Sequence, residues 1–309
     1  MKDKITLEES IVLWVKSHEN KVALPKSDLL IFLYNIRNSK KYDNFEISRV
    51  RKDANIKTLF ENAVNFLEES KLIENTKYDY FILLSEKDIT PLGLACSFYS
   101  HGYISYLSAM EYYKITRKIA KSIDFVIPDR ESWKILEINR ISTMGVISEG
   151  IDPKCLCISY PSIKTKFQRR KLNIHSRKNL FPSIQNKDSV RVIEIGCLFL
   201  EMIRNPESCG GFDEVLEAFI NFGPKYYEEI ISAANDYGTK LDKSKIGFLL
   251  EEFLNINHST FAEWQETSVM RGGSRKMLSS AAYSNNYSEA WCISLNHPKF
   301  IDISNSLES

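Results

Sequence analysis

Hydrophobic positions recur at helical spacing in the amino-terminal part of the chain. A first helix is predicted near 7–18, where Thr6-Leu7-Glu8-Glu9 has the form of a capping box. Apolar residues at the same spacing predict a second helix near 28–37. The clearest pattern lies between Ile56 and Glu69, where the apolar stripe consists of Leu59, Phe60, Ala63, Val64 and Leu67. This part of the chain is therefore predicted to contain three helices.

Two strand-like segments follow the third helix. Residues 71–73 and 78–84 are aliphatic or aromatic and flank a polar gap, which predicts a β-hairpin. Three helices followed by a hairpin is the order of a winged helix-turn-helix, although other helical domains also end in a hairpin. The turn Thr90-Pro91-Leu92-Gly93 marks the predicted domain boundary, so the domains are expected at 1–90 and 91–309.

Beyond this boundary the pattern predicts strands first and helices after them. Two short helices are expected at 94–99 and 105–113, and strands at 123–127, 133–136 and 155–160 indicate a small, mainly antiparallel sheet. Three apolar helical faces follow: Val192, Ile195, Phe199 and Met202; Val215, Leu216, Phe219 and Ile220; and Ile246, Leu249, Leu250 and Phe253. The predicted fold class is α+β, with a winged helix-turn-helix followed by a mixed α+β domain that ends in helices.

Charge is distributed unevenly along the chain. The 309 residues carry 41 Lys+Arg and 40 Asp+Glu, so any attraction to nucleic acid must come from local patches. Lys154–Lys178 holds eight basic residues and no carboxylate, whereas Glu201–Glu266 holds thirteen acidic and five basic residues. The basic run either contacts phosphates or neutralises the acidic helices, and both interpretations stay open. Its candidate DNA contacts are Lys164, Lys166, Arg169, Arg170 and Lys171.

The polar side of the third predicted helix has the chemistry of a DNA reader. Asparagine can pair with adenine, and lysine or arginine can pair with guanine or phosphate. The candidate DNA-binding residues here are Arg49, Arg51, Lys52, Lys57, Thr58 and Asn62. An exposed polar face is also the ordinary state of a surface helix, and Glu61, Glu68 and Glu69 would repel DNA unless they point away.

The sequence contains none of the common catalytic patterns. A glycine-rich phosphate loop, His-Glu-x-x-His and Gly-x-Ser-x-Gly are all missing from it. Asp129, Glu131 and Lys134 are only distantly similar to the acid–lysine set of metal-dependent nucleases, because they lie too close together. We therefore expect no enzymatic activity, no cofactor and no metal. The acidic amino terminus and the shortness of the apolar runs predict a cytoplasmic protein without a membrane partner.

Four segments resemble the AbiEi family, the antitoxins of abortive-infection, type IV toxin–antitoxin systems. His101–Tyr113 resembles the family's "GYIS-x-LSAL-x-Y" segment, and Val192–Gly211 resembles its helix and "PE-x-CGG" turn. Lys245–Glu251 resembles "RLGFLLE", and Arg271–Lys276 with Trp291 and Asn296 resembles the ending "GS-x-L…W-x-L…N". The motif residues are Tyr103, Ser105, Ser108, Pro206, Gly210, Gly211, Gly247, Arg271, Ser274 and Arg275. Many members also carry an acid pair of the form Glu-x-x-x-x-Asp before the glycine turn. Glu194 matches its first position, whereas the second falls among Phe199, Leu200 and Glu201, so the second carboxylate has no definite match.

This resemblance implies a winged helix that binds inverted repeats in its own promoter. It also implies a second domain that neutralises a nucleotidyltransferase-like toxin, so the expected function is that of an antitoxin and transcriptional autorepressor in phage defence. Reading an inverted repeat requires two recognition elements one DNA turn apart. Either a homodimer on DNA or a second contact with DNA by the basic run Lys154–Lys178 meets this requirement. The alternative is a protein-interaction module that masks a toxin through its acidic helices and does not bind DNA.

Overall fold

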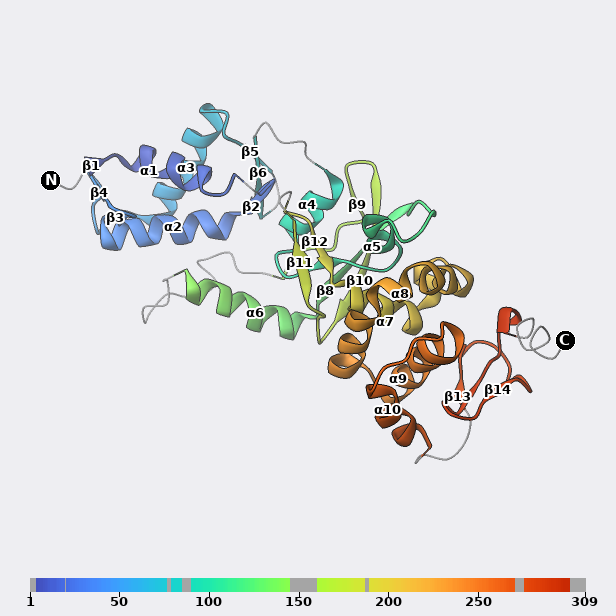
Figure 1. The fold of residues 1–309 in the computed structure, drawn as a ribbon. Coiled ribbons are helices and arrows are strands. Elements are labelled where there is room, and N and C mark those ends of the chain that lie inside the picture. Colours follow the sequence, from blue (N-terminus) through green and yellow to red (C-terminus); the bar gives the residue numbers. More distant parts are fainter. Residues whose placement is uncertain are drawn as a thin grey trace. The chain divides into compact units, whose positions relative to one another are not determined.

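The computed structural model divides the chain into two compact units. It describes residues 4–19, 21–76, 79–84, 90–144, 160–186, 189–269 and 275–300. Unit 1 consists of Met1–Ile104 and Lys121–Val192, and unit 2 consists of Ser105–Ala120 and Ile193–Ser309. Both units combine helices with small sheets (Figure 1), so the predicted α+β class is confirmed. The boundary predicted between residues 90 and 91 stays a prediction.

The three predicted amino-terminal helices are present in unit 1. They are α1 (Leu7–Lys16), α2 (Lys26–Ser39) and α3 (Ile56–Glu69). The capping box of α1 is formed: the Glu9 amide donates to the Thr6 hydroxyl at 3.1 Å, and the Thr6 amide donates to the Glu9 carboxylate at 2.7 Å. Asn55 caps α3 by accepting a hydrogen bond from the Lys57 amide at 2.9 Å. These caps satisfy amide groups that have no partner within the helix.

A single hydrophobic core joins the three helices. On α3, the buried members are Ala63, Val64 and Leu67, all from the predicted stripe. They share this core with residues of α1 and α2, where Trp14 stacks on Phe32 with ring centroids 5.1 Å apart. Because the stripe is buried against α1 and α2, the polar residues on the other side of α3 are left at the surface.

Two three-stranded sheets accompany these helices. The first contains β2 (Ala23–Pro25), β5 (Ile73–Asn75) and β6 (Tyr80–Leu83) in the order β2-β6-β5, with antiparallel pairing throughout. The second contains β1 (Lys4–Ile5), β3 (Lys41–Tyr42) and β4 (Phe45–Ile47) in the order β1-β4-β3. The predicted hairpin after α3 is therefore confirmed as β5 and β6. Strands β1 to β4 have only two or three residues, too few to produce a recognisable alternation.

Unit 1 also contains a six-stranded sheet. Its strands are β7 (Tyr103–Ile104), β8 (Ser122–Pro128), β9 (Lys166–Phe167), β10 (Arg170–Arg177), β11 (Ser183–Gln185) and β12 (Arg191–Ile193), in the order β11-β12-β7-β8-β10-β9. Strands β8 and β10 are parallel from Ser122↔Lys171 to Pro128↔Arg177, whereas β7 and β8 are antiparallel. The sheet is mixed, so the prediction of a mainly antiparallel sheet is wrong. The long helical connection between β8 and β10 is the kind that allows parallel pairing.

That connection contains the second error of the sequence-based prediction. Residues 133–136 were expected to form a strand, but they lie within α6 (Arg130–Thr143). The carboxylate of Asp129 accepts a hydrogen bond from the Ser132 amide at 2.8 Å and so starts the helix. The tryptophan and the isoleucine of this segment favour strands intrinsically, and the helix cap outweighs that preference. The strand expected at 155–160 lies outside the described residues except for Tyr160.

Short helices precede and follow β7. Helix α4 (Pro91–Phe98) lies in unit 1 and α5 (Tyr106–Tyr113) in unit 2, close to the two predicted short helices. A Cβ at Gly102, between them, would lie 2.2 Å from the Phe125 ring, so only glycine fits this approach to β8.

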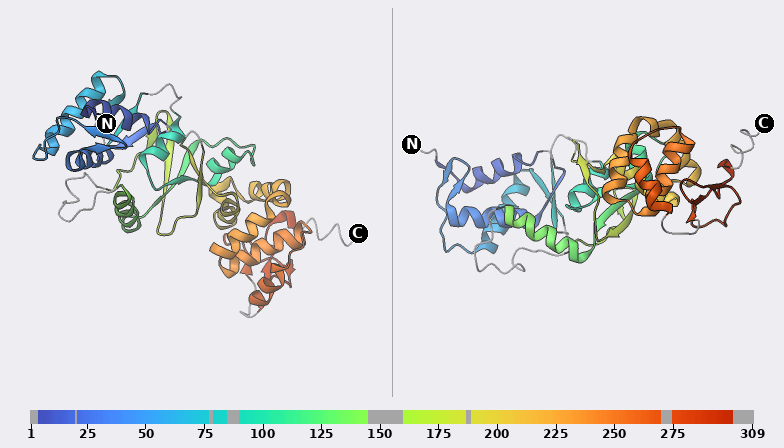
Figure 2. Two further views of the ribbon diagram at one scale, coloured as in Figure 1. Left: turned by 60° about the vertical axis from the view of Figure 1, so that its left-hand side comes forward. Right: turned by 60° about the horizontal axis from the view of Figure 1, so that its bottom comes forward.

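Unit 2 is mainly helical. Its further elements are α7 (Ile195–Arg204), the 3₁₀ helix η2 (Pro206–Cys209), α8 (Phe212–Tyr237), α9 (Lys240–Gly247), the π-helix η3 (Phe248–Phe253), α10 (Thr260–Val269), β13 (Arg275–Lys276), β14 (Tyr287–Ser288) and β15 (Ile293–Ser294). Helix α7 packs along α8, as Figure 2 shows from two sides. The predicted apolar faces pack inside this unit, except that Val192 belongs to β12 and Ile220 is exposed.

Candidate functional site

The polar side of α3 is open to solvent. Lys57, Thr58 and Asn62 are all exposed, and they lie off the buried stripe. Lys57 approaches Glu61 at 4.0 Å, with both side chains more than half exposed (82% and 58%). Such a pair is stabilised very little in water. The Lys57 ammonium is thus held only weakly and can exchange Glu61 for another anion.

Three of the predicted DNA-binding residues line one groove beside α3. Arg49 and Arg51 lie on the connection from β4 to α3, and Asn62 lies on α3 itself. The groove has a volume of about 470 Å³, and its floor includes the side chains of Leu59 and Phe66. Lys52, Lys57 and Thr58 are exposed outside it. Two arginines and an asparagine therefore line an open, partly apolar groove.

The groove also contains one acidic residue, which would repel an anion. Glu8, in the first turn of α1, lies among its lining residues.

Arg49 has a φ of 62°, in the left-handed region that a residue with a Cβ adopts only at a cost. The connection holds this conformation just before the amide cap of Asn55. The backbone at Arg49 is therefore held in a conformation that few residues with a side chain adopt.

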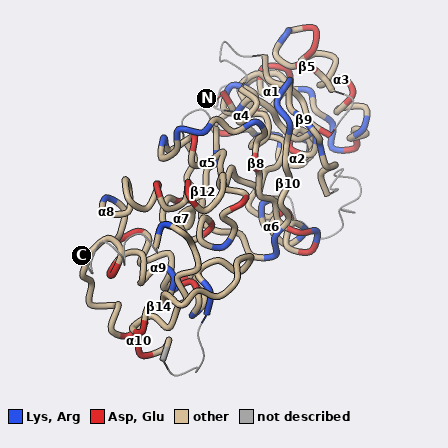
Figure 3. Tube along the Cα trace, turned by 90° about the vertical axis from the view of Figure 1, so that its right-hand side faces the viewer, with Lys and Arg blue, Asp and Glu red and all other residues tan. Residues whose placement is uncertain are grey.

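The described part of the basic run includes the outer hairpin of the six-stranded sheet, while residues 154–159 lie outside the described residues. Strands β9 and β10, along which Figure 3 colours the Lys and Arg positions blue, pair Lys166 with Lys171. The exposed Arg169 lies in the turn between them. Like charges placed opposite each other across strands repel. This arrangement concentrates positive charge on an edge hairpin. Lys164 differs, because its ammonium lies over the Phe98 ring, 5.3 Å from the centroid, and Arg170 is half-buried.

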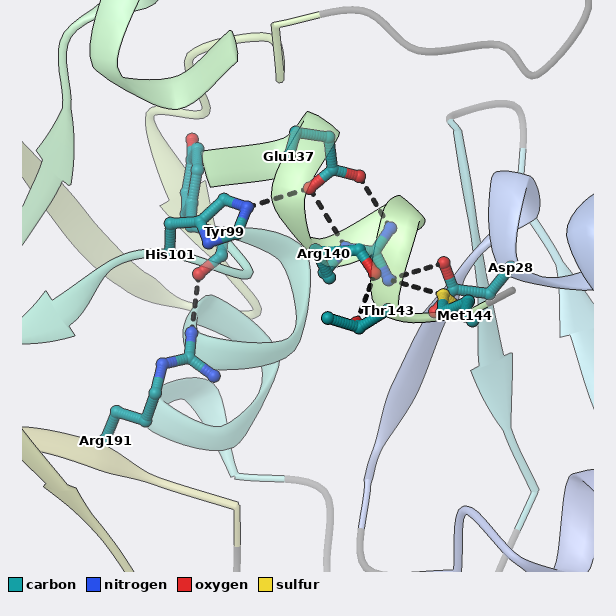
Figure 4. Close-up of polar contacts among 8 residues, drawn as sticks. All are labelled: Asp28, Tyr99, His101, Glu137, Arg140, Thr143, Met144 and Arg191. Atoms are coloured by element: carbon teal, nitrogen blue, oxygen red, sulfur yellow. Dashed lines mark hydrogen bonds and ion pairs between the residues drawn. The ribbon is translucent and has the colours of Figure 1, made fainter. Parts of the chain in front are cut away.

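A buried polar cluster that the sequence did not indicate lies elsewhere in unit 1 (Figure 4). Arg140 of α6 forms ion pairs with Asp28 of α2 at 2.8 Å and with Glu137 at 2.5 Å. Glu137 also lies 2.8 Å from Nε2 of His101. Burial by itself would raise the pKa of Glu137, but hydrogen bonds from His101 and Arg140 outweigh it and lower this pKa to about 2. The cluster therefore contains a carboxylate that stays charged.

A second arginine, Arg191, binds the carbonyl groups at the end of α4. Arg191 of β12 donates through Nε to the Gly102 carbonyl at 2.8 Å, and through Nη2 to the carbonyls of Tyr99 and Cys96. Carbonyl groups at a helix C-terminus have no partners within the helix and carry the negative end of its dipole. Arg191 satisfies them, while burial lowers its own pKa.

The glycine turn of unit 2 has a structural role. Gly210 and Gly211 have φ values of 90° and 96°, which other residues rarely adopt, and the Gly211 amide donates to the Pro206 carbonyl at 2.8 Å. The ammonium of Lys118 donates to the Gly210 carbonyl at 2.6 Å. This resemblance segment thus forms a tight link between η2 and α8.

Two further resemblance segments meet in the core of unit 2. The Trp291 ring packs against Gly247, where a Cβ would lie 2.1 Å from the ring, and its Nε1 donates to Glu251 at 3.0 Å. Asn296 donates to the Leu278 carbonyl at 2.8 Å. Arg275 lies 3.5 Å from the Ser244 hydroxyl, while Arg271 and Ser274 lie outside the described residues.

The remaining motif residues are buried. The Tyr103 hydroxyl accepts a hydrogen bond from the Phe181 amide at 3.0 Å, and Ser105 and Ser108 are both inside the protein. Glu194 begins α7, and Glu201 is buried on the same helix. The burial of Tyr103, Ser105, Ser108 and Glu201 fits a role in folding and keeps these residues from direct contact with a large partner, whereas Glu194 is exposed.

The acid–lysine set that distantly resembled a nuclease site does not assemble on neighbouring strands. Asp129 caps α6, and Glu131 and Lys134 are exposed on that helix. Within the described ranges, no group of three or more His, Cys, Asp or Glu residues is arranged to hold a metal ion. Nor is any helix in those ranges both long enough and apolar enough to span a membrane.

Comparisons with known proteins give little help. Neither the protein-family models nor the curated proteins contain a match to this chain. Among solved structures, the chain is similar to the crystal structure of the RV2827C protein from Mycobacterium tuberculosis, with a TM-score of 0.43 and 9% sequence identity. The similarity covers 98% of this chain and 97% of that one. It is too weak to assign a fold or a function.

Proposed function

We propose that this chain is a DNA-binding autorepressor and antitoxin of the AbiEi type, without catalytic activity. In this proposal the part of unit 1 from α1 to β6 is a winged helix-turn-helix. Apart from the hairpin β3–β4 between α2 and α3, its element order α1-β2-α2-α3-β5-β6 and its sheet order β2-β6-β5 fit that fold. The observation that carries the proposal is the exposed polar face of α3 beside the groove of Arg49 and Arg51.

One feature departs from the simplest helix-turn-helix. The link between its two helices usually has about three or four residues. Here β3 and β4 lie between α2 and α3 and pair as a hairpin. The hairpin lengthens the link but leaves the polar side of α3 exposed, so α3 keeps the surface that a recognition helix needs.

The side chains divide between positioning and reading. Arg51 and Lys52 would contact phosphates, and Lys57, Thr58 and Asn62 would face base edges. The wing would be the hairpin near 74–78, of which Lys77 and Tyr78 lie outside the described residues. The basic β9–β10 hairpin would supply a second contact with the DNA backbone.

The proposal is tested with the DNA upstream of the chain's own gene in gel shifts at several salt concentrations. Each neutralised phosphate changes the slope of log affinity against log salt by about 0.9. Arg51→Ala should therefore flatten this slope by about one unit, while Asn62→Ala should keep the slope and lose base preference. Lys16→Ala, which removes an exposed lysine at the other end of α1, serves as the matched control. An unchanged slope and unchanged base preference in the first two variants would exclude α3 as the reading helix.

A second candidate function rests on unit 2. Helix α8 exposes the acidic side chains Asp213, Glu217, Glu228, Glu229 and Asp236. Such a surface attracts a basic partner. In this alternative the chain masks a toxin through its acidic helices and does not bind DNA. Co-purification with a neighbouring gene product, together with no shift of promoter DNA, would favour it over the repressor.

A further inference from the structure

A small pocket in unit 1 gathers three basic side chains. It has a volume of about 220 Å³, and Lys21, Arg140 and Arg191 are among its lining residues. They come from the segment before β2, from α6 and from β12. Asp28 is the one acidic side chain among the described lining residues. The pocket is unrelated to the groove beside α3, because the two share no lining residue.

The positive charges of the pocket are not fully matched. Arg140 is paired with Asp28 and Glu137, as described above. Arg191 donates to backbone carbonyls, and Lys21 has no ion pair with a carboxylate in the part of the chain that the structure describes. Three cations and two carboxylates leave a formal excess of one positive charge. Burial, opposed by Asp28 and reinforced by the neighbouring arginines, lowers the pKa of Lys21, as expected for a cation short of anionic partners.

One lining residue of the pocket, Ser97, carries a hydroxyl group that makes no hydrogen bond to the described residues. Oγ of Ser97 is buried and has no hydrogen-bond partner among the described residues. Ser100 lies beside it in the same wall. A buried polar atom without a partner is unusual, because it loses its bonds to water and gains none in return. A ligand oxygen that reaches Oγ of Ser97 from the pocket would supply that partner.

Size and chemistry together select the kind of ligand. Pockets for drug-sized molecules usually exceed about 300 Å³, so this one suits a smaller group. Guanidinium, ammonium and hydroxyl donors are the set that binds phosphoryl oxygens. We propose that the pocket binds the phosphoryl group of a small anion, either inorganic phosphate or a phosphate monoester, through Lys21, Arg191 and Ser97. The bound anion would link the helical region at α2 to the six-stranded sheet.

The test is calorimetric titration of the full chain at constant ionic strength, with inorganic phosphate in one arm and a nucleoside 5′-monophosphate in the other. We expect saturable binding with one site per chain. Lys21→Met should weaken it by about tenfold or more, because one charge-assisted contact is lost. Lys16→Met removes an exposed lysine outside the pocket and should bind as the unaltered chain does.

A second variant, Ser97→Ala, tests the pocket without removing a charge. Ser97→Ala removes only a hydroxyl group that has no hydrogen-bond partner in the described part of the chain, so the fold should persist while phosphate binds more weakly. Stronger binding of inorganic phosphate would identify the free ion as the ligand, and stronger binding of the monophosphate would identify an ester; both support the pocket. No saturable binding in either arm, or equal affinity in Lys21→Met and the unaltered chain, would overturn the proposal.

Discussion

Glu137 is a carboxylate held in its charged form inside the protein. Its side chain is 5% exposed, and its pKa of about 2 lies below the ordinary value of 4.5. A lowered pKa in the folded state stabilises that state fully above about pH 4.5, and the stabilisation is lost as the pH falls toward 2. The difference corresponds to about 3 kcal/mol near neutral pH.

Glu137→Gln should therefore lower the free energy of unfolding by about 2 to 3 kcal/mol at pH 7, since Arg140 and His101 lose their charged partner. The difference from the unaltered chain should shrink as the pH is lowered from 4.5 toward 2, where Glu137 becomes protonated. Urea unfolding at several pH values measures both effects. Glu131→Gln, at an exposed position on the same helix, is the control. A difference that stays constant with pH would contradict the assignment.

Single residues differ in how well the sequence predicts them. The exposure of Arg51, Lys57 and Asn62 follows from their place off an apolar stripe, and the sequence indicates it. The cluster around Glu137 does not follow, because Asp28 and His101 reach it from distant parts of the chain. Only the spacing of Glu137 and Arg140 on one helix hints at a contact. Buried ion pairs between elements require knowledge of the packing.

Helix α9 ends at Gly247, which packs closely against the ring of Trp291. A Cβ at Gly247 would lie 2.1 Å from the Trp291 ring, which is completely buried and has no room to move. Overpacking of this kind costs about 1 to 3 kcal/mol, whereas replacing glycine by alanine within a helix gains about 1 kcal/mol. Gly247→Ala should therefore lower the thermal midpoint of unit 2, as calorimetry would measure.

A double-mutant cycle separates this clash from other causes. The ring atoms nearest to Gly247 belong to the six-membered ring of the indole, and Phe in place of Trp291 would leave most of that space empty. The destabilisation by Gly247→Ala should become smaller when Trp291→Phe is also present. Equal effects in both backgrounds would show that the ring contact is not responsible.

Whole elements were predicted well where one strong signal existed. Helix α3 occupies the predicted range Ile56–Glu69, because its apolar stripe and its Asn55 cap agree. At α6 the signals disagreed, since strand-favouring side chains follow a helix-capping Asp129. The short strand β2 gave no signal in the sequence, yet it completes the sheet with β5 and β6. Short strands of this kind are determined by their neighbours in space, which a single sequence does not display.

At the scale of the whole molecule, the proposed repressor must reach both halves of an inverted repeat. The net charge is only +1, so contact with DNA depends on local surfaces such as the α3 face and the β9–β10 hairpin. If α3 alone reads bases, one chain covers one half-site, and two chains are needed at a spacing of about 10 base pairs or a multiple of it.

We therefore predict two chains per full repeat and one chain per isolated half-repeat, as measured by native mass spectrometry of the complexes. Scrambling one half of the repeat should reduce the complex to a single chain. If the basic β9–β10 hairpin instead contacts the second half-repeat, one chain should bind the full repeat. Lys166→Ala together with Arg169→Ala should then abolish the protection of that half against cleavage. A one-to-one complex that is insensitive both to scrambling and to these substitutions would contradict both ways of reading an inverted repeat, because neither half would then be recognised by a second element.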